Sequence, residues 1–329
     1  MRATLRLTRF LAVIAAVVAC MGLAGPATAQ DKYPSKAVRI IVGYGPGTTS
    51  DVFARLIARA LSDRWHQPVF VENRAGAAGA IGAEVVAKSA PDGYTLMLIS
   101  NAFTLGPMLQ ASLPYDPFRD FIAITQVAQT PNIFLASKKL GISNLKEFIA
   151  LGKKDPGKLQ YSSSGRGTPS QISVELFKSM TGLQIEEIPY KDSNQAFTDV
   201  ISGVVSLNAP GLAQGLPYVA AGRVVTLGIT GSKRSPAAPE IPTLAEEGVP
   251  GYEAYGWHGI FVPAKTPPDM VAFLNKELVT ILKDPKLQAL FAKQGAEIVA
   301  STPAEFTAFL HKDFDKWQKL FKQLGIKPE

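Results

Sequence analysis

Residues 37–51 read AVRIIVGYGPGTTSD, an apolar and β-branched run followed by a loop of glycine, proline and threonine. The run over 37–44 predicts a short buried strand. Apolar side chains then recur at helical spacing from Ser50 to Arg64, so a helix should follow the loop directly. A strand, a glycine-rich turn and a helix in this order begin a βαβ unit, which favours an α/β fold.

The same pattern continues downstream. Residues 68–73 and 95–100 are apolar runs of strand length, and a second glycine loop at 76–82 leads into a predicted helix that ends near Lys88. Because strands alternate with helices, we predict mostly parallel sheets with helices on both faces.

The second half of the chain repeats the alternation. Asn144 and Glu147 have the spacing of a capping box, and Thr168 followed by Pro169 predicts another helix start. We expect strands at 159–162, 184–188 and 224–230, and helices at 144–154, 169–180, 194–201, 212–221, 268–283 and 303–323.

The N-terminus has the composition of an export signal. Three arginines precede an apolar run over 10–24, and small residues follow up to a predicted cleavage site after Ala29. The run is too short for a stable transmembrane helix. Removal of residues 1–29 lowers the formal net charge from +7 to +4, because three arginines and no acids are lost. We therefore expect a signal peptide and a periplasmic location.

Cys20 is the single cysteine among 329 residues, which excludes a disulfide scaffold and a cysteine-rich zinc site. Residues 17–20 also have the pattern of a lipobox, so a lipid anchor at Cys20 is the alternative to cleavage after Ala29. Both interpretations imply export.

The signatures of common enzymes are missing from the sequence. In residues 82–89 an alanine stands where a phosphate-binding loop needs its second glycine, and Pro46 breaks the dinucleotide-binding pattern after the first strand. No G-x-S-x-G motif occurs, and His66, His258 and His311 have no metal-ligand spacing. Basic residues do not cluster with aromatic ones. We expect no enzyme, cofactor, metal or nucleic-acid partner, and we expect His258 to be a packed residue.

Two loops, at 43–51 and 162–168, lie where a predicted strand ends and a helix begins. In open α/β sheets, ligands bind outside the carboxyl ends of the strands. Helix N-termini present unpaired amides with a partial positive charge, and glycines let the backbone approach a ligand. These loops therefore predict an anion site, in which Asp51 caps a helix rather than contacting the anion.

Several ordered segments resemble the periplasmic solute-binding proteins of tripartite tricarboxylate transporters, the Bug or TctC family. The resemblance covers the whole mature chain. It rests on YPSK (33–36), VENRAGAAGAIGAE (71–84), PDGYTL (91–96), LPYDPFRDF (113–121), YSSSGRGT (161–168), PYKDS (189–193), KRSPAAPEIPTLAEEGVPGYEAYGW (233–257) and TPPDM (266–270).

This resemblance implies a Venus-flytrap fold, type II-like, of two α/β domains joined by crossover strands. It places one domain at 30–130 plus 252–329 and the other at 131–251, with the ligand cleft between them. It also implies a monomer that carries a small carboxylate to membrane permease subunits. The ligand loops of the family fall on the two loops already selected.

The candidate ligand-binding residues come from both loops and from the ends of neighbouring strands: Tyr44, Gly45, Pro46, Gly47, Thr48, Thr49, Ser50, Ser100, Asn101, Phe103, Ser163, Ser164, Gly165, Arg166, Gly167, Thr168, Tyr190, Asn208 and Pro210. Arg166 has the chemistry to pair with a distal carboxylate. An acidic pair frequent in the family is replaced at 208–211, which argues against a cationic amine on the ligand. We expect a mono- or dicarboxylate with an apolar or aromatic body.

Two other functions remain open at this point. The protein could provide the ligand-sensing input to a membrane sensor kinase, which the sequence does not separate from transport. It could also be an exported hydrolase, although no serine, histidine and aspartate constellation supports that reading.

Overall fold

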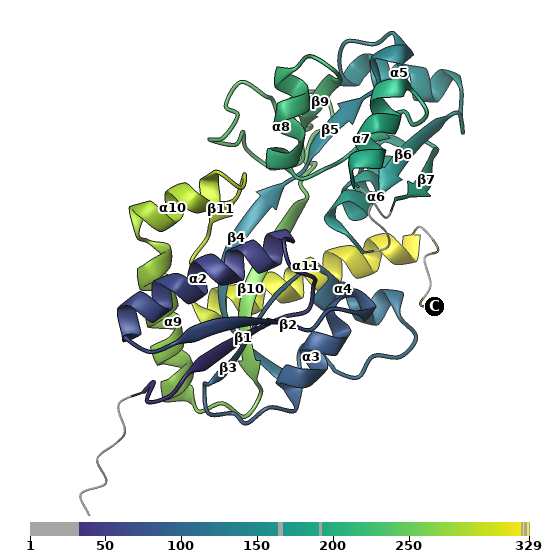
Figure 1. The fold of residues 1–329 in the computed structure, drawn as a ribbon. Coiled ribbons are helices and arrows are strands. Elements are labelled where there is room, and N and C mark those ends of the chain that lie inside the picture. The colour runs from purple at the N-terminus through teal and green to yellow at the C-terminus, as the bar shows by residue number, and fades with distance from the viewer. Residues whose placement is uncertain (1–32, 164–166, 191–192, 324, 326–327, 329) are drawn as a thin grey trace, which may run out of the picture. The chain divides into compact units, whose positions relative to one another are not determined.

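The structure is a computed structural model that describes residues 33–163, 167–190, 193–323, 325 and 328. The chain divides into a short N-terminal unit, Met1–Lys36, and a main unit, Ala37–Glu329. The predicted signal peptide and Cys20 lie outside the described residues. Within the described ranges, no helix is long and apolar enough to cross a membrane. The main unit contains two sheets (Figure 1).

The first sheet has the strand order β11-β4-β10-β3-β1-β2. Its strands are β1 (Val38–Val42), β2 (Val69–Asn73), β3 (Thr95–Ser100), β4 (Phe121–Pro131), β10 (Tyr255–Pro263) and β11 (Glu297–Ile298). The helices of this part are α2 (Thr49–Trp65), α3 (Ala80–Ala87), α4 (Ala102–Leu109), α9 (Pro268–Leu282), α10 (Pro285–Ala292) and α11 (Pro303–Gln323), with a short 3₁₀ turn η1 (Ala77–Gly79).

The second sheet has the strand order β7-β6-β8-β5-β9. Its strands are β5 (Ile133–Ala136), β6 (Leu159–Ser163), β7 (Ile185–Pro189), β8 (Leu207–Asn208) and β9 (Val225–Ile229). The accompanying helices are α5 (Leu145–Lys154), α6 (Pro169–Thr181), α7 (Ser193–Ser202) and α8 (Leu212–Ala220), with a 3₁₀ turn η2 (Lys138–Leu140).

Both sheets are mixed, which corrects the expectation of mostly parallel pairing. The βαβ units give parallel pairs, β1 with β2 and β3, and β6 with β7 and β8. By contrast, β10 runs antiparallel to β3 and β4, and β5 runs antiparallel to β8 and β9. The reversals arise because the chain passes from β4 directly into β5, and later returns to the first sheet as β10 (Figure 1).

The start of α2 follows from its sequence, with one correction. Thr48, rather than Asp51, is the N-cap residue, and its hydroxyl accepts a hydrogen bond from the Asp51 amide. Asp51 lies in the first turn, where its carboxylate accepts a hydrogen bond from the Gly47 amide at 3.0 Å. The two residues act as a reciprocal cap that fixes the loop before the helix.

The predicted caps of the second half are confirmed. The Asn144 side chain accepts a hydrogen bond from the Glu147 amide at 2.9 Å, and the Glu147 carboxylate accepts one from the Ser143 amide at 2.7 Å. Thr168 caps α6, and Pro169 occupies the first helical position. These local hydrogen bonds define where α5 and α6 begin.

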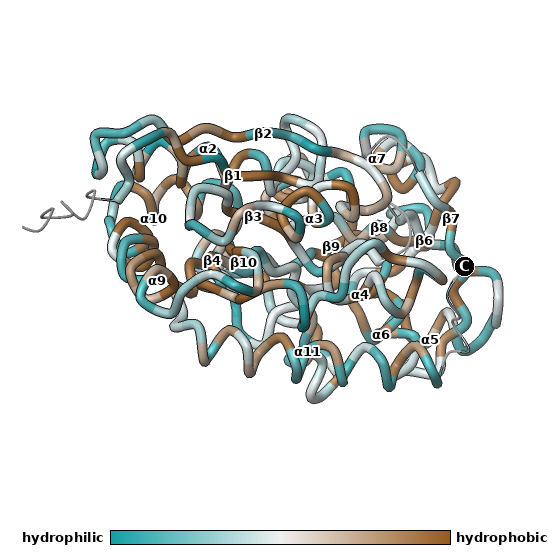
Figure 2. The backbone as a smooth tube through the Cα atoms, turned by 90° about the horizontal axis from the view of Figure 1, so that it is seen from below, coloured by the Kyte–Doolittle hydropathy of each residue, from teal (hydrophilic) through white to brown (hydrophobic). Residues whose placement is uncertain are grey.

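Helix α11 contributes to the cores beside both sheets. Phe306 and Leu310, near its start, belong to the apolar cluster that contains Trp257 and Phe261 of β10. Further along, Trp317 and its neighbours Leu320 and Phe321 belong to the cluster that covers one face of the second sheet. In Figure 2, β1 is apolar except at Arg39, whereas α11 alternates between apolar and polar positions, as a helix with one buried face must.

Three glycines allow the loop after β1 to approach the loop before α3. A Cβ atom placed on Gly43 would lie 2.7 Å from the Cα atom of Gly79 and 2.9 Å from its carbonyl oxygen, and one on Gly82 would lie 2.8 Å from the Cα atom of Gly43. Because these neighbours are backbone atoms that cannot rotate away, any side chain at Gly43 would push the two loops apart.

Candidate functional site

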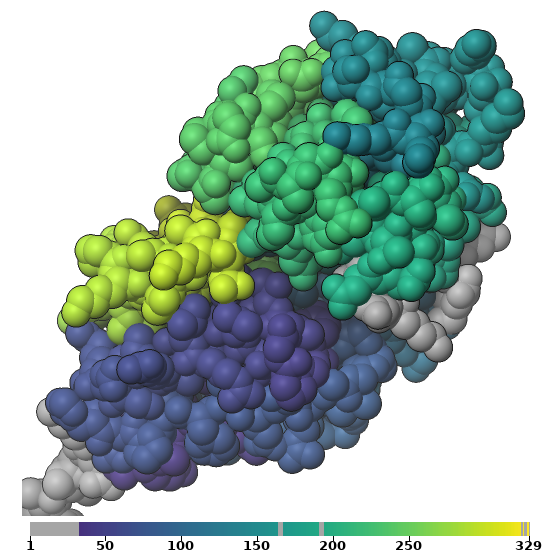
Figure 3. Space-filling view, turned by 45° about the horizontal axis from the view of Figure 1, so that its top comes forward, coloured from purple at the N-terminus to yellow at the C-terminus, as the bar shows by residue number. Residues whose placement is uncertain are grey.

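A cavity of about 410 Å³ lies where the first turns of several helices meet. Its walls come from both predicted loops and from the strand ends where the chain passes between the sheets. In the space-filling view, the purple segment with α2, the green segment with α8 and the yellow segment with α10 meet on one face (Figure 3). The residues that line it are Tyr44, Gly47, Thr48, Thr49, Ser50, Val52, Ser100, Thr130, Asn132, Thr168, Pro169, Ser170, Ala209, Pro210, Gly211, Leu212, Ala213, Gln214, His258 and Gln294.

Three of the described helices begin at this cavity. The N-cap residues of α2 and α6, Thr48 and Thr168, line it, and so does Gly211, which precedes α8 and provides no side-chain cap. None of the described lining residues is lysine, arginine, aspartate or glutamate. The positive potential available from the described wall is therefore that of backbone amides at helix starts, which suits an anion.

The amides of α2 are held in position by Asp51, which is 3% exposed. Its carboxylate accepts hydrogen bonds from the Gly47 amide, the Arg55 guanidinium at 2.9 Å and the Asn73 amide group at 2.9 Å. Burial alone would raise the pKa of Asp51, but these hydrogen bonds and the charge of Arg55 together lower it. The carboxylate is thus satisfied within the loop and leaves the amides of Thr49 and Ser50 outside the cap.

Tyr44 and Ser100 form one wall of the cavity. Their hydroxyl groups are 2.9 Å apart, and burial raises the pKa of the tyrosine. Tyr44 therefore remains a neutral hydroxyl, and the pair offers a polar contact between the end of β1 and the end of β3.

His258 is packed, as the sequence predicted, and it also lines the cavity. Its ring is 6% exposed and makes an edge-to-face contact with Phe53, with the ring centroids 4.9 Å apart. The Nδ1 atom is buried and has no hydrogen-bond partner within the described part of the chain. Burial lowers the pKa of His258 to about 4, so the imidazole is neutral at pH 7.

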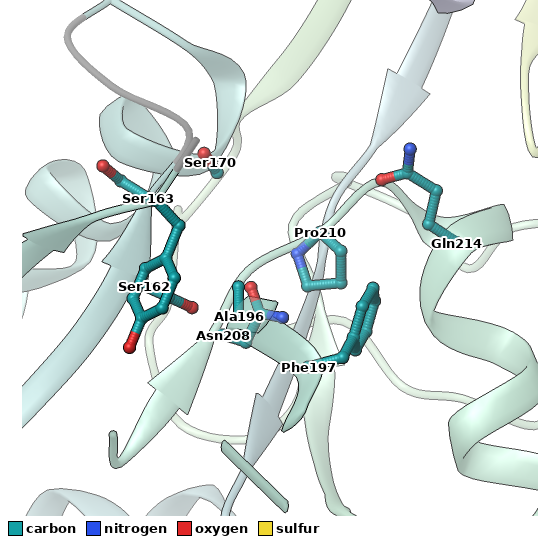
Figure 4. A pocket seen from close by; sticks show the side chains of 9 residues that line it. Ser162, Ser163, Ser170, Ala196, Phe197, Asn208, Pro210 and Gln214 are labelled. Atoms are coloured by element: carbon teal, nitrogen blue, oxygen red, sulfur yellow. The ribbon is translucent and has the colours of Figure 1, made fainter. Parts of the chain in front are cut away.

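A smaller cavity of about 30 Å³ lies beside the second sheet and shares the residues Ser170, Pro210 and Gln214 with the larger one. Figure 4 shows Ser163 and Ser170 on one wall and Phe197, Pro210 and Gln214 opposite, with Asn208 between them. The residues that line it are Ser162, Ser163, Ser170, Tyr190, Ala196, Phe197, Asn208, Pro210 and Gln214.

The two cavities collect many of the predicted ligand residues. The larger cavity is lined by Tyr44, Gly47, Thr48, Thr49, Ser50, Ser100 and Thr168. The smaller cavity is lined by Ser163, Tyr190 and Asn208, and Pro210 lines both. Ser164, Gly165 and Arg166 lie outside the described residues.

Other predicted ligand residues lie elsewhere. Gly45 and Pro46 belong to the first loop but line neither cavity, and the buried Gly167 donates its amide to the Gln171 side chain at 2.7 Å. Asn101 holds β10 in place, because its side chain accepts from the Trp257 amide and donates to the Tyr255 carbonyl.

Phe103 is fully buried. Its ring stacks on Tyr115 and contacts Phe121 and Phe261 in the core of the first sheet.

Sequence reasoning missed several of the lining residues that come from outside the two loops. Thr130 and Asn132 stand at the passage from β4 to β5, and His258 lies on β10 directly opposite Ser100. Gln214 lies in the first turn of α8, and Gln294 follows α10. Only the first turn of α8 carried a signal in the sequence, since any helix start beside a strand end is a candidate ligand contact.

The family follows from comparison with known proteins. Residues 53–326 match the model described as the tripartite tricarboxylate transporter family receptor. The chain belongs to this receptor family. Its relative BugT of Bordetella pertussis is 36% identical over 325 residues, which are 98% of this chain and 99% of BugT.

Solved structures agree with the receptor fold. Rpa4515 of R. palustris, solved with adipate, has a TM-score of 0.80 and 32% identity, and the match covers 90% of this chain and 100% of that protein. MatC of Rhodopseudomonas palustris, with bound malate, has a TM-score of 0.73 and 27% identity over 88% of this chain and 99% of MatC. The predicted α/β architecture and the predicted family are confirmed, and the receptor is a periplasmic solute-binding protein by family.

Proposed function

We propose that this receptor captures a small organic carboxylate in the larger cavity and delivers it to the membrane permease subunits of a tripartite tricarboxylate transporter. The main support for the proposal is that α2, α6 and α8 all begin at one cavity of about 410 Å³. None of the described residues that line this cavity is lysine, arginine, aspartate or glutamate. Such a wall neutralises an anion with amides and hydroxyls alone.

The helix starts do not contribute equally. Pro169 occupies the first position of α6 and has no N–H, so that helix offers its N-cap hydroxyl, from Thr168, in place of a first amide. The amides at the starts of α2 and α8 supply the backbone donors. Each hydrogen bond to a charged group contributes about 1.5–3 kcal/mol, so several are required to offset the cost of association of about 4–15 kcal/mol.

The ligands of two similar proteins support this ligand class. Rpa4515 was solved with adipate and MatC with malate, and both molecules are dicarboxylates. In this receptor, the loop at 44–50 would grip a carboxylate while the segment at 162–168 closes over it. We propose that 30–130 with 252–329 and 131–251 move as the two domains, and that closure is driven by contacts made only in the closed state.

We also propose the setting in which this happens. The export signal predicted at 1–29 would direct the mature receptor to the periplasm. There the receptor would act as a monomer that binds and releases its ligand without changing it chemically.

The decisive experiment removes one amide without disturbing its helix. Thr49 is the first residue of α2, where proline is tolerated, and Thr48 before it has φ −69° and ψ 159°, a conformation compatible with a following proline. Thr49→Pro therefore deletes the N–H and the hydroxyl, whereas the matched control Thr49→Ala deletes the hydroxyl alone.

Binding would be measured by calorimetry after a thermal-shift screen of linear carboxylates and their primary amides. We expect carboxylates to bind and their amides not to bind. We expect Thr49→Pro to weaken carboxylate binding about 10- to 100-fold, the equivalent of one charged hydrogen bond, and Thr49→Ala to weaken it much less. Equal affinities in both variants and in the wild type would refute the role of the α2 amides.

A further inference from the structure

Several hydroxyl groups that line the small cavity beside the second sheet donate their hydrogens to fixed partners in the protein. Three of the residues that line this cavity carry hydroxyl groups whose hydrogens are already directed away from it. The Ser163 hydroxyl donates to a Glu187 carboxylate oxygen at 2.5 Å, and the Tyr190 hydroxyl donates to an Asp199 carboxylate oxygen at 2.6 Å. The Ser162 hydroxyl donates to the Leu207 carbonyl at 3.4 Å.

A hydroxyl that donates its one hydrogen can only accept from a further partner. The oxygens of Ser162 and Tyr190 therefore face an occupant of the cavity as acceptors. If one of these hydroxyl groups rotated its hydrogen toward the cavity, the carbonyl or carboxylate oxygen that now accepts it would lose that hydrogen bond. Leaving a buried acceptor unsatisfied costs more free energy than the new hydrogen bond contributes. Burial, together with donation to Asp199, also raises the pKa of Tyr190 to about 12, so its proton stays in place at neutral pH.

The charges around the cavity oppose a second anion. Glu187 and Asp199 lie directly behind the hydroxyls of Ser163 and Tyr190, and Glu187 also accepts from the Gln171 side chain at 2.7 Å. No lysine or arginine is among the described residues that line the cavity. A carboxylate placed here would feel two negative charges across a single layer of hydroxyls.

The remaining walls suit a small, neutral group. Asn208 is 5% exposed and contributes an amide, while Ala196 and Phe197 are apolar. Both acids already accept hydrogen bonds from the protein, so a buried ammonium would lose its hydration without direct contact to a carboxylate. A volume of about 30 Å³ has room for about two water-sized centres, the size of a hydroxyl or a compact amide.

We propose that this cavity binds a neutral, hydrogen-bond-donating head group at the far end of the ligand, a hydroxyl or a carboxamide, and that it rejects a second carboxylate. The ligand would thus be a monocarboxylate whose charged end lies at the start of α2 and whose neutral polar end reaches the small cavity past Ser170, Pro210 and Gln214. This assignment rests on the proposed carboxylate-binding function and names its substrate class.

The test uses linear ligands that differ only at one end. For each chain of four to seven carbons, the wild-type receptor is titrated with the dicarboxylate, its monoamide, the ω-hydroxy acid and the plain fatty acid, for example adipate, adipamate, 6-hydroxyhexanoate and hexanoate. At the best chain length, we expect the monoamide or the hydroxy acid to bind at least tenfold more tightly than both the dicarboxylate and the plain acid.

A charge variant then tests the cavity directly. Gln214 is exposed and lines both cavities, so Gln214→Lys should place a cation beside the small cavity without disturbing the core. We expect it to reverse the preference and favour the dicarboxylate. Gln184→Lys is the matched control, because Gln184 is exposed and lines neither cavity, and it should leave the ratio between monoamide and dicarboxylate unchanged.

The outcomes separate the two proposals. Tight binding of the dicarboxylate by the wild type would overturn the head-group assignment while leaving carboxylate binding intact, and it would direct attention to Arg166 as the partner of a distal carboxylate. Preference for the plain fatty acid would also overturn it. Failure of every carboxylate in the series to bind would overturn both proposals.

Discussion

Acidification from pH 7 to pH 5 should lower the free energy of unfolding by about 2 kcal/mol through His258 alone. Burial lowers the pKa of this ring to about 4, against 6.5 for an unperturbed histidine. Below pH 6.5 the unfolded chain binds a proton that the folded protein does not. Stability is therefore complete above the unfolded pKa and is lost progressively as the pH falls toward 4, to a limit of about 3 kcal/mol.

No described neighbour of the ring opposes this loss. The ring contacts Phe53, and its strand partners are Ser100 of β3 and Ala128 of β4, which carry no charge. A proton added to His258 in the ligand-free receptor would find no carboxylate among these residues to stabilise it.

Urea unfolding of the ligand-free mature protein, followed at several pH values between 7 and 5, measures the effect. We expect His258→Gln to lose about 2 kcal/mol less than the wild type over this interval, because glutamine cannot take up a proton. His311→Gln is the control, since it removes an exposed histidine in place of the buried one. Parallel pH curves for the wild type and His258→Gln would refute the reasoning.

Three further predictions concern residues that hold the loops and helices near the cavity in place. Gly43→Ala should destabilise the protein by about 1–3 kcal/mol, because the added Cβ would lie 2.7 Å from the Gly79 backbone. Gly45→Ala is the control and should change stability little, because there is open space around Gly45; thermal unfolding of both variants measures the difference. Glu277→Gln should cost about 1–2 kcal/mol in urea unfolding at pH 7, because the glutamate accepts from the Arg64 guanidinium at 2.6 and 3.0 Å and from the Trp65 indole at 2.8 Å. The hydrogen bond from Arg64 lowers the pKa of Glu277, so the difference from wild type should be complete above pH 4.5 and should shrink only as the pH falls through that lowered pKa. Asp51→Asn should weaken carboxylate binding about tenfold in calorimetry, because its single oxygen cannot replace both Oδ2, which accepts from Gly47 and Arg55, and Oδ1, which accepts from Asn73. Unchanged affinity would mean that the loop holds its shape without the carboxylate.

The parts of the fold that local chemistry determines could be predicted from the sequence. The starts of α5 and α6 depend on hydrogen bonds within a few residues of Asn144 and Thr168, and such patterns can be read directly. β4 offered no comparable signal: Phe121–Pro131 has neither helical spacing nor strict alternation, since it is buried against neighbours on both faces along most of its length.

The candidate site was predictable only in part. The two loops were found because a strand end, glycines and a helix start stand together in the chain. His258 and Phe103 show why the remainder was not. His258 lies within β10 and Phe103 lies in the first turn of α4, each among apolar neighbours. Their local sequences do not show that the histidine ring reaches the cavity while the phenylalanine ring packs on Tyr115. That difference is decided by partners distant in the chain.

The position of β10 has a consequence for how the protein is made. In the first sheet β10 lies between β3 and β4, yet it is synthesised after every strand of the second sheet. While the chain emerges from the ribosome, β3 and β4 therefore lack β10, the strand that pairs with both of them. The segment that builds the second sheet has to fold as an insertion within an unfinished sheet. The first residues to appear belong to the part that is completed last, and a nascent chain halted before Tyr255 would expose the edges of β3 and β4.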